Sequence, residues 1–245
     1  MSESNHDIDR MFEDLGMTAS LQRWKEILKS PEIGNYSAQQ MLREVLTPQY
    51  VETLNTRYTT NLKFSKLIDK CAQVENLKTG NGRRYNDTVV RQILTFSFVP
   101  DHLNIGIYGK TGAGKSYFMS ALCNEACRQN YRCMYLDYSD LLDELLILAQ
   151  NKDLARYSKK LKYNSRLRIL FLDDFAISRY SEDGVKIVYH LLKTRTDLGY
   201  PTVFTCQYAP SEWGDKISDD PECYGKLDGI RRRLTTGYTV EVVKL

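Results

Sequence analysis

Hydrophobic and polar positions divide the chain into a helical amino-terminal part and a longer part in which strands and helices alternate. Between residue 7 and about residue 77 the apolar residues recur at helical spacing, and no segment has a convincing strand pattern. The helices expected there cover residues 7–15 and 18–28, a short segment capped by Ser37 with Gln40, and a long segment from Thr47-Pro48 to about residue 74. Four helices in so short a stretch predict a small separate module.

From Asn104 onward, short apolar runs alternate with helical patterns. Strands are expected over residues 103–108, 132–136, 169–172, 201–205 and 238–243, and helices over residues 117–129, 141–148 and 185–197. The expected caps are Asp87 for an earlier helix over residues 88–96, Ser139 or Asp140 for residues 141–148, and Ser181 for residues 185–197. Because strand–helix–strand crossovers are right-handed, the alternation predicts an α/β fold with a parallel sheet and helices on both faces.

The segment between these two parts is the expected linker. Residues 78–84, Lys-Thr-Gly-Asn-Gly-Arg-Arg, are polar and basic and contain two glycines. We therefore expect a helical module over residues 1–80 and a second domain over residues 81–245.

A glycine-rich segment carries the clearest chemistry in the chain. Residues 109–116 fit the pattern G-x-x-x-x-G-K-[S/T] without a gap, and they lie between an expected strand and an expected helix. Glycines let backbone N–H groups turn toward an anion, and the helix start adds the positive end of its dipole. The residues expected to contact a nucleotide are Gly109, Lys110, Thr111, Gly112, Ala113, Gly114, Lys115, Ser116 and Tyr117. Lys115 is expected to reach the outer phosphates of ATP, and the Ser116 hydroxyl to ligand Mg²⁺; the alternative is a glycine-rich turn that matches by chance.

Two carboxylates follow an apolar run farther along the chain. Asp173 and Asp174 end the expected strand over residues 169–172, the pattern of a buried strand that delivers acids at its carboxyl edge. Asp173 is expected to hold Mg²⁺, and Asp174 to orient or deprotonate the attacking water. Gln207 follows the next strand and is expected beside the γ-phosphate. For the acids the alternative is a polar turn, and for Gln207 a buried glutamine that caps a loop.

Composition limits which partners the protein can bind and where in the cell it is expected. The formal charge is +3, from 34 basic and 31 acidic residues, so any nucleic-acid surface must be local. No run of eighteen apolar residues exists, and the first residues are polar and acidic rather than signal-like. These features predict a cytoplasmic protein without a membrane partner.

The cysteines offer little metal chemistry at the level of sequence. The six cysteines form no C-x-x-C pair, and the three histidines are far apart, so a zinc site is not expected. Cys123 and Cys127 are one helical turn apart on an expected core helix. We interpret the cysteines as reduced and mostly buried small hydrophobic residues.

Two basic stretches are candidates for a local nucleic-acid surface. In the first, lysines at helical spacing are expected to share one face of the long helix, with Phe64 interleaved. The second, residues 152–168, is the most basic window in the chain. The candidate DNA-binding residues are Lys63, Lys66, Lys70, Lys159, Lys160, Lys162 and Arg166. For both stretches the alternative is an ordinary solvated surface.

Several segments together carry a resemblance to a known family over about residues 10–240. They are Leu15-Gly16-Met17-Thr18, residues 104–109, residues 170–175, Thr205-Cys206-Gln207 followed by Glu212-Trp213-Gly214, and Arg233-Leu234. With an extra strand after the paired acids, the chain resembles the AAA+ branch of P-loop ATPases. More narrowly, it is similar to the IstB family of transposition helpers, relatives of the DnaC helicase loaders.

This resemblance implies an AAA+ core with a five-stranded parallel sheet, preceded by a small all-α domain. It implies that Gln207 senses the γ-phosphate and that Arg233 is an arginine finger, which completes the ATP site of an adjacent subunit in a homo-oligomer. It also implies Mg-dependent ATP hydrolysis, largely sequence-independent DNA binding and recruitment of a transposase to its target. A DnaC-like helicase loader is the alternative.

The chain departs from the family pattern in two places. The family usually continues past the last strand with a G-E-S-x-R-like segment, whereas residues 242–245 end this chain, so an extended lid is expected to be absent. The usual D-R-L has become R-R-L, which leaves open which of Arg231, Arg232 and Arg233 is the finger. A metabolic P-loop kinase is a third possibility; the helical front module, the extra strand and the missing lid arginines argue against it.

Overall fold

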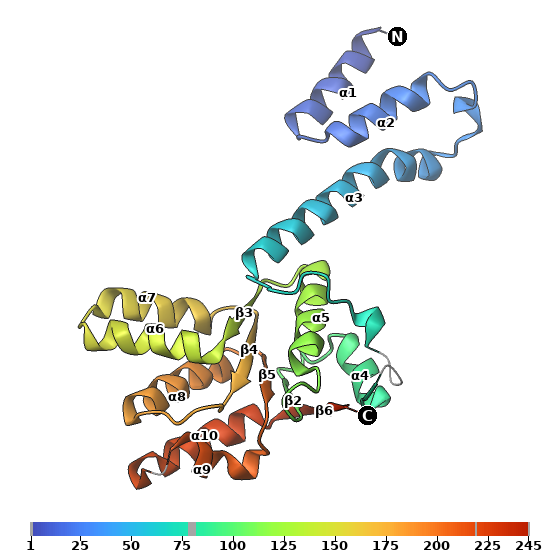
Figure 1. Ribbon diagram of the computed structural model, residues 1–245. Helices are drawn as coiled ribbons and strands as arrows, with labels where there is room; N and C mark the ends of the chain where they lie inside the picture. The colour runs from blue at the N-terminus through green and yellow to red at the C-terminus, as the bar shows by residue number, and fades with distance from the viewer. Residues whose placement is uncertain (1, 78–81, 219, 245) are drawn as a thin grey trace. The chain divides into compact units, whose positions relative to one another are not determined.

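A parallel five-stranded sheet in the order β3-β4-β5-β2-β6 lies at the centre of the larger of two compact units (Figure 1). The computed structural model describes residues 2–77, 82–218 and 220–244. The strands are β2 (Asn104–Tyr108), β3 (Cys133–Asp137), β4 (Ile169–Phe175), β5 (Thr202–Cys206) and β6 (Gly237–Glu241). In register, Ile105 pairs with Val203 on one side and with Tyr238 on the other. The expected parallel sheet is confirmed.

Helices cover both faces of this sheet (Figure 1). One face carries α4 (Asp87–Leu94) and α5 (Lys115–Arg128), and the other carries α6 (Tyr138–Gln150), α8 (Glu182–Asp197) and α10 (Tyr224–Leu234). α7 (Leu154–Ser165) packs on α6 and α8, and the short α9 (Trp213–Ile217) packs on α10. None of the described helices has the length and apolar character needed to cross a membrane.

Burial on both faces explains the apolar composition of the central strands. Ile169, Leu170, Phe171 and Leu172 are each at most 1% exposed, because alternate side chains of β4 point to opposite helical layers. Leu170 and Leu172 belong to the core shared with α6, α8 and α10. The strand therefore holds its carboxyl-terminal acids in a fixed position at the edge of a rigid layer.

The residue that caps each helix is the one whose side chain accepts a hydrogen bond from the first free N–H groups. Ser181 caps α8 as expected, accepting a hydrogen bond from the Gly184 N–H at 3.2 Å. The expected cap Asp87 is wrong, because Asn86 accepts from the first turn of α4. The expectation of Ser139 or Asp140 is also wrong: α6 begins earlier, and Asp137 caps it through the Asp140 N–H at 3.1 Å.

A two-stranded antiparallel sheet was not expected from the sequence. In it, β1 (Arg83–Arg84) pairs with β7 (Val243–Lys244), so part of the expected linker is a strand. The remaining short elements are 3₁₀ turns at Ile33–Asn35, Val74–Asn76, Pro210–Glu212 and Pro221–Cys223. The sequence of β1 has no alternating pattern, so only its partner strand reveals it.

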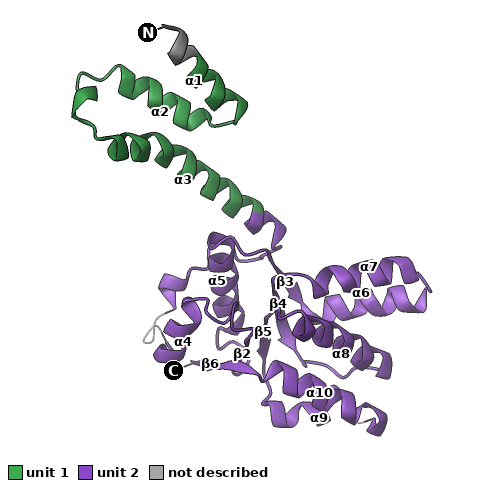
Figure 2. Ribbon diagram, turned by 180° about the vertical axis from the view of Figure 1, so that it is seen from behind, with its two compact units in different colours: residues 1–60 green, residues 61–245 purple. Residues whose placement is uncertain are grey.

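The smaller unit, residues 1–60, is helical as expected (Figure 2). It contains α1 (Ser2–Asp14), α2 (Thr18–Leu28) and most of α3 (Ala38–Phe64). The two units meet in the sequence between Thr60 and Asn61, inside α3. The expected boundary between residues 80 and 81 lies outside the described residues, as do residues 78–81 of the expected linker, and that boundary stays a prediction.

The expected long helix from Thr47-Pro48 to about residue 74 is wrong at both ends. The capping box of Ser37 and Gln40 is present, with the Ser37 N–H donating to Gln40 Oε1 at 2.9 Å, but the helix it opens continues through Pro48 to Phe64. Proline removes one donor from the helix interior, and this helix tolerates the loss. Lys66 has a left-handed φ of 56°, which ends helical geometry. Lys63, Lys66 and Lys70 therefore do not share one helix face.

Candidate nucleotide-binding site

The glycine-rich segment forms a loop between β2 and α5, as the motif requires. Gly114 has a φ of 104°, a conformation that side chains disfavour, and it immediately precedes the first residue of α5. A Cβ at Gly109 would collide with the backbone carbonyl of Val242, and one at Gly114 with the guanidinium of Arg83. Gly109 is thus required by the Val242 backbone as well as by its own conformation. Gly114 is required by its conformation, because the Arg83 side chain can shift.

Lys115 and Ser116 begin the helix that follows the loop. The Lys115 side chain is buried, with 5% of the residue exposed, and its Nζ donates to the Lys110 carbonyl oxygen at 3.2 Å. This bond folds the ammonium back over the loop, where the first N–H groups of α5 also lie. The Ser116 hydroxyl donates to Asp173 Oδ1 at 3.3 Å, which joins the loop to the end of β4.

Three hydroxyl groups surround the Asp173 carboxylate. Besides Ser116, Thr205 of β5 donates to Oδ1 at 2.5 Å, and Tyr135 of β3 donates to Oδ2. The sequence predicted the role of Asp173 but not those of Tyr135 and Thr205. These two residues lie on β3 and β5, and only the strand order shows that β3 and β5 flank β4. Burial first, and then the hydrogen bond to Asp173, raise the pKa of Tyr135, so the phenol stays a neutral donor.

The same oxygens fit a hard divalent cation. Mg²⁺ binds oxygen ligands at about 2.0–2.1 Å in octahedral geometry, so adjacent ligand oxygens lie roughly 3 Å apart. The 3.3 Å separation of Ser116 Oγ and Asp173 Oδ1 is close to that value. These two residues therefore suit the roles in Mg²⁺ binding that the sequence predicts for them.

Asp174 has a strained backbone and a perturbed carboxyl group. Its φ is 55°, and its N–H donates to Thr205 Oγ1 at 2.8 Å and to Asp173 Oδ1 at 3.2 Å. Burial and then the charge of Asp173 raise the pKa of Asp174, while the Lys115 ammonium opposes them. A raised pKa moves a carboxylate toward the range in which it accepts a proton during a reaction.

The sequence-predicted residues meet around a cavity of about 320 Å³. Lys115, Ser116 and Asp174 line it, together with Thr111 and Gln207. Gln207 Oε1 accepts a hydrogen bond from the Thr111 hydroxyl at 2.9 Å, so the end of β5 is joined to the loop. Tyr117 also borders this cavity. The fold thus brings together residues from three segments that are far apart in the sequence.

A second and larger cavity lies on the other side of the loop. Its volume is about 690 Å³, and it extends from Gly109 and Ala113 to Val242 and Tyr208. It shares Thr111 and Gln207 with the smaller cavity, so the two cavities adjoin. Its volume is sufficient for a small organic ligand. Sequence reasoning did not predict any of the residues on its far wall.

Tyr135 is expected to position Asp173, and its hydroxyl can be removed with little change of volume. In Tyr135→Phe, Asp173 Oδ2 loses its donor, and we expect Mg²⁺-dependent nucleotide turnover to fall about 10–100-fold, as for other lost partners of metal ligands. A titration of activity with Mg²⁺ should show a weaker apparent affinity for the ion. The control is Tyr138→Phe, which removes a buried hydroxyl whose neighbour is Tyr180 rather than Asp173. Equal Mg²⁺ dependence in both variants would contradict this role.

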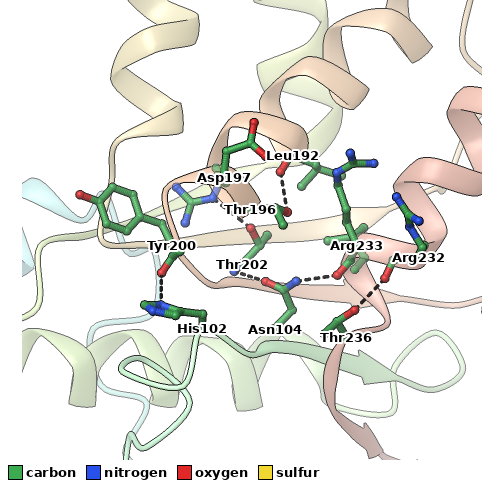
Figure 3. Close-up of a pocket in the computed structure, with 13 residues that line it drawn as sticks. His102, Asn104, Leu192, Thr196, Asp197, Tyr200, Thr202, Arg232, Arg233 and Thr236 are labelled. Atoms are coloured by element: carbon green, nitrogen blue, oxygen red, sulfur yellow. Dashed lines mark hydrogen bonds between the residues drawn. The ribbon is translucent and has the colours of Figure 1, made fainter.

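Arg232 and Arg233, near the end of α10, line a different cavity, of about 400 Å³ (Figure 3). Asn104, the first residue of β2, donates from Nδ2 to the Arg233 carbonyl oxygen at 2.7 Å. The Arg233 guanidinium lies 4.9 Å from the centre of the Tyr189 ring, and its Nη1 donates to the Gly229 carbonyl oxygen at 2.9 Å. Its Nε is buried and has no hydrogen-bond partner within the described structure. The guanidinium is therefore only partly satisfied.

The two neighbours of Arg233 differ from it. Arg231 pairs with Asp228 at 2.6 Å and is exposed, whereas Arg232 is exposed at the rim of the cavity in Figure 3. Arg195, on the same cavity, is 1% exposed and donates to the carbonyl oxygens of Leu167 and Pro201, among other acceptors. Burial lowers the pKa of Arg195 to about 9. Its bonds tie α8 to the starts of β4 and β5, so its role is structural.

All but one of the expected basic residues are exposed, and Lys160 is the exception. Lys159, Lys162 and Arg166 are exposed on α7 and at its end, at spacings of three and four. Lys160 instead pairs with Glu144 of α6 at 2.7 Å. Lys63, Lys66 and Lys70 are exposed in the segment that ends α3 and follows it. Only part of the expected basic window thus presents free charge.

Comparisons with known proteins agree with this site. The sequence profile described as IstB-like ATP binding protein matches residues 11–233. An insertion-sequence ATP-binding protein of Sinorhizobium fredii is 25% identical over 225 residues, which are 92% of this chain and 89% of that protein. The replicative helicase loader DnaI of Bacillus subtilis is 29% identical over 107 residues, which are 43% of this chain and 33% of the loader.

Solved structures share the fold of the larger unit. A crystal structure of DnaI superposes with a TM-score of 0.60 and 21% identity over 71% of this chain and 92% of that one. AMPPCP-bound DnaA from Aquifex aeolicus superposes with a TM-score of 0.58 and 20% identity over 72% of this chain. The matched part is 51% of the DnaA chain, about half its length. The expected AAA+ P-loop fold is confirmed.

Proposed function

Because the chain belongs to the family of IstB-like ATP-binding proteins, we propose that it is an AAA+ ATPase that assembles on DNA in its ATP-bound form. In this proposal the assembly recruits or activates a transposase for insertion at the target site, and hydrolysis of ATP takes the assembly apart. The insertion-sequence ATP-binding proteins among its relatives support the link to transposition.

The proposed chemistry assigns one task to each residue around the smaller cavity. Backbone N–H groups of residues 109–116 and the Lys115 ammonium bind the phosphates of ATP. Ser116 and Asp173 hold Mg²⁺, which neutralises charge on the phosphate oxygens. Asp174 orients the attacking water and accepts its proton, and Gln207 contacts the γ-phosphate.

The observation that carries the proposal of an oligomer is the position of Arg233. Its carbonyl is bonded to Asn104 at the start of β2, whereas the phosphate loop begins after Tyr108 at the other end of that strand. A strand rises about 3.3 Å per residue, so roughly 13 Å of β2 separates the two ends. An arginine at one end cannot reach phosphate at the other end in its own subunit. If Arg233 supplies a cation to hydrolysis, it supplies it to another copy of the chain.

A single basic surface is the best candidate for DNA contact. Phe64, at the end of α3, lies 6.2 Å from the ring of Tyr163 on α7, and the guanidinium of Arg132 lies 4.2 Å from the centre of the Phe64 ring. This packing joins the segment that carries Lys63 to the helix that carries Lys162. Two stretches that the sequence treats as separate candidates therefore adjoin. We name Lys63, Lys66, Lys159, Lys162 and Arg166 the α3–α7 surface.

Phosphate contacts by the α3–α7 surface predict a change in the salt dependence of DNA binding. The triple variant Lys159→Ala, Lys162→Ala, Arg166→Ala is expected to bind duplex DNA more weakly for all sequences. The slope of log K against log salt is expected to fall by up to about 3 units, roughly one per contact. The matched control replaces Lys186 and Lys193 of α8, which pair with Glu182 and Asp197. Unchanged affinity and slope in the triple variant would place DNA elsewhere.

The assembly itself can be tested by sedimentation. Asp174→Asn with ATP and duplex DNA is expected to form larger complexes than the same protein with ADP, because the trapped ATP state maintains the subunit contacts. Equal sedimentation with both nucleotides would overturn the proposal.

A helicase loader is the second candidate, and the similarity to DnaI favours it over other classes. In that function the principal partner is a hexameric helicase, and the helical unit binds that partner rather than DNA. Affinity capture with the full chain and ATP distinguishes the two: capture of a transposase with an integrase-type core supports the first proposal, and capture of a replicative helicase the second.

A further inference from the structure

Three cysteine thiols converge at one edge of the central sheet. Cys123 and Cys127 lie one turn apart on α5, and Cys133 is the first residue of β3, the edge strand next to β4. All three side chains are fully buried. Cys133 Sγ lies 3.6 Å from Cys127 Sγ and 3.8 Å from Cys123 Sγ, and all three sulfurs lie within 4.8 Å of one another.

These Sγ–Sγ distances match the distance between two thiolate sulfurs bound to the same zinc ion. Zinc–sulfur bonds are about 2.3 Å, so two sulfurs in tetrahedral geometry lie roughly 3.8 Å apart. Both measured Sγ–Sγ distances agree with that value to within about 0.2 Å, and small side-chain rotations would bring the third pair to it. An ion at the centre of the triangle would therefore contact all three sulfurs without moving the backbone.

The remaining polar environment of the thiols is weak. The Cys133 thiol is 3.9 Å from the Cys123 carbonyl oxygen, and the nearby Ser65 hydroxyl donates to the Leu62 carbonyl oxygen. No histidine or carboxylate joins the three sulfurs as a fourth ligand in the described part of the chain. The donor set is thus purely sulfur, which selects soft ions over Mg²⁺.

The positions of the three residues also favour chelation. They lie within eleven residues of sequence, on a helix and on the strand that follows it, so little chain entropy is lost when all three bind. The loop of residues 129–132 that joins them is at the surface, since Gln129 and Asn130 are exposed.

We propose that Cys123, Cys127 and Cys133 form a binding site for a divalent thiophilic ion of the zinc class. Binding converts three thiols to thiolates, and the protons leave to solvent. A divalent ion with three thiolates leaves a net charge of −1, whereas Cu(I) would leave −2 in a buried site, which is less favourable. The fourth coordination position has no side-chain ligand among the described residues. The bound ion fastens the carboxyl half of the phosphate-loop helix to the edge strand.

The experiment uses the full chain, reduced with a phosphine, freed of metal by a chelator and kept without nucleotide. Cd²⁺ is added as a spectroscopic probe, and Zn²⁺ is titrated against a chromophoric chelator. We expect one equivalent of either ion per chain, with an ultraviolet thiolate-to-cadmium absorption band. Zn²⁺ should also raise the melting temperature, because it binds only the folded state tightly.

Cys133→Ala is expected to lose the cadmium band and at least about 100-fold in zinc affinity, since even partners of metal ligands contribute 10–100-fold. The control variants are Cys223→Ala, also buried, and Cys71→Ser, which is exposed; both should bind like wild type. If Cys133→Ala does not fold, wild type decides alone: one equivalent of Cd²⁺ should give the thiolate band, and Zn²⁺ should raise the melting temperature.

Three results would overturn the proposal. They are the absence of a cadmium band in wild type, a zinc affinity that Cys133→Ala leaves unchanged, and an equal loss in Cys71→Ser. Binding of Cu(I) without Zn²⁺ or Cd²⁺ would overturn the assignment to a divalent ion. None of these measurements depends on ATP or DNA, so the outcome is independent of the proposed function.

Discussion

Arg233→Ala is expected to lower ATP hydrolysis by about 10³- to 10⁵-fold, the range known for loss of an arginine that stabilises transferring phosphate. ATP binding should change little, because the phosphate loop is at the opposite end of β2. The structural basis is a guanidinium with one hydrogen bond, a contact with the Tyr189 ring and a buried Nε without a partner among the described residues. Steady-state ATPase assays and a nucleotide-binding titration measure the two quantities separately.

Mixing two inactive variants locates the arginine in space. Lys115→Ala lacks a functional phosphate site but keeps Arg233, and Arg233→Ala has the opposite defect. In a mixed oligomer, the intact phosphate loop of an Arg233→Ala subunit can adjoin the intact Arg233 of a Lys115→Ala subunit. We therefore expect activity to return in the mixture and to fall on dilution.

The neighbouring arginines serve as controls for the same experiment. Arg231→Ala breaks only an exposed ion pair with Asp228 and should keep near wild-type activity. Arg232→Ala tests the exposed side chain at the rim of the cavity in Figure 3. A large loss of ATP hydrolysis in Arg232→Ala, together with normal hydrolysis in Arg233→Ala, would identify Arg232 as the arginine finger. Failure of the mixture to recover at any ratio, with both variants folded, would refute hydrolysis across a subunit boundary.

Asp174→Asn is expected to lower the rate of hydrolysis by about 10²- to 10⁴-fold while ATP still binds, because asparagine can orient water but cannot accept its proton. The wild-type rate should decrease as pH falls through the pKa of Asp174. Burial and the charge of Asp173 raise that pKa, so the acid limb should lie above the ordinary carboxyl range. A pH profile of kcat/KM for ATP, which reports groups of the free enzyme, measures the limb.

Stability provides the control for this substitution. A carboxyl group whose pKa is raised by folding favours the folded state below its unfolded pKa, and this contribution is lost as pH rises through the folded pKa. At neutral pH the Asp174 carboxylate is therefore unfavourable in the fold, and asparagine should leave the melting temperature unchanged or higher. A marked decrease in melting temperature would mean that the lost activity reflects damage to the fold. An acid limb at the ordinary carboxyl pKa would remove Asp174 as its source.

The sequence determined the features that depend on local chemistry. The spacing of Gly109, Gly114 and Lys115 specifies a phosphate loop because backbone conformation and charge act within eight consecutive residues. The apolar run before Asp173 specifies a buried strand because both of its faces must be covered. The alternation of these runs with helical patterns was sufficient to predict the parallel sheet, which the structure confirms.

Local patterns were less reliable where several weak signals compete. Thr47-Pro48 has the composition of a helix start, but α3 continues through it because the capping box at Ser37 had already opened the helix. Asn86 and Asp87 are both good caps, and their order along the chain does not reveal which one meets the free N–H groups. The segment of β1 has no pattern of its own, because a two-residue strand is defined by its partner.

Only the tertiary structure determined which distant side chains meet. The hydroxyls of Tyr135 and Thr205 donate to the two oxygens of Asp173. Cys133 lies beside Cys123 and Cys127. The ends of α3 and α7 contact each other through Phe64 and Tyr163. The tertiary structure also separates Arg233 from its own phosphate loop by the length of β2. The physical reason is that a motif reflects interactions among residues that are close in sequence. Strand order and helix packing determine which distant residues become close in space.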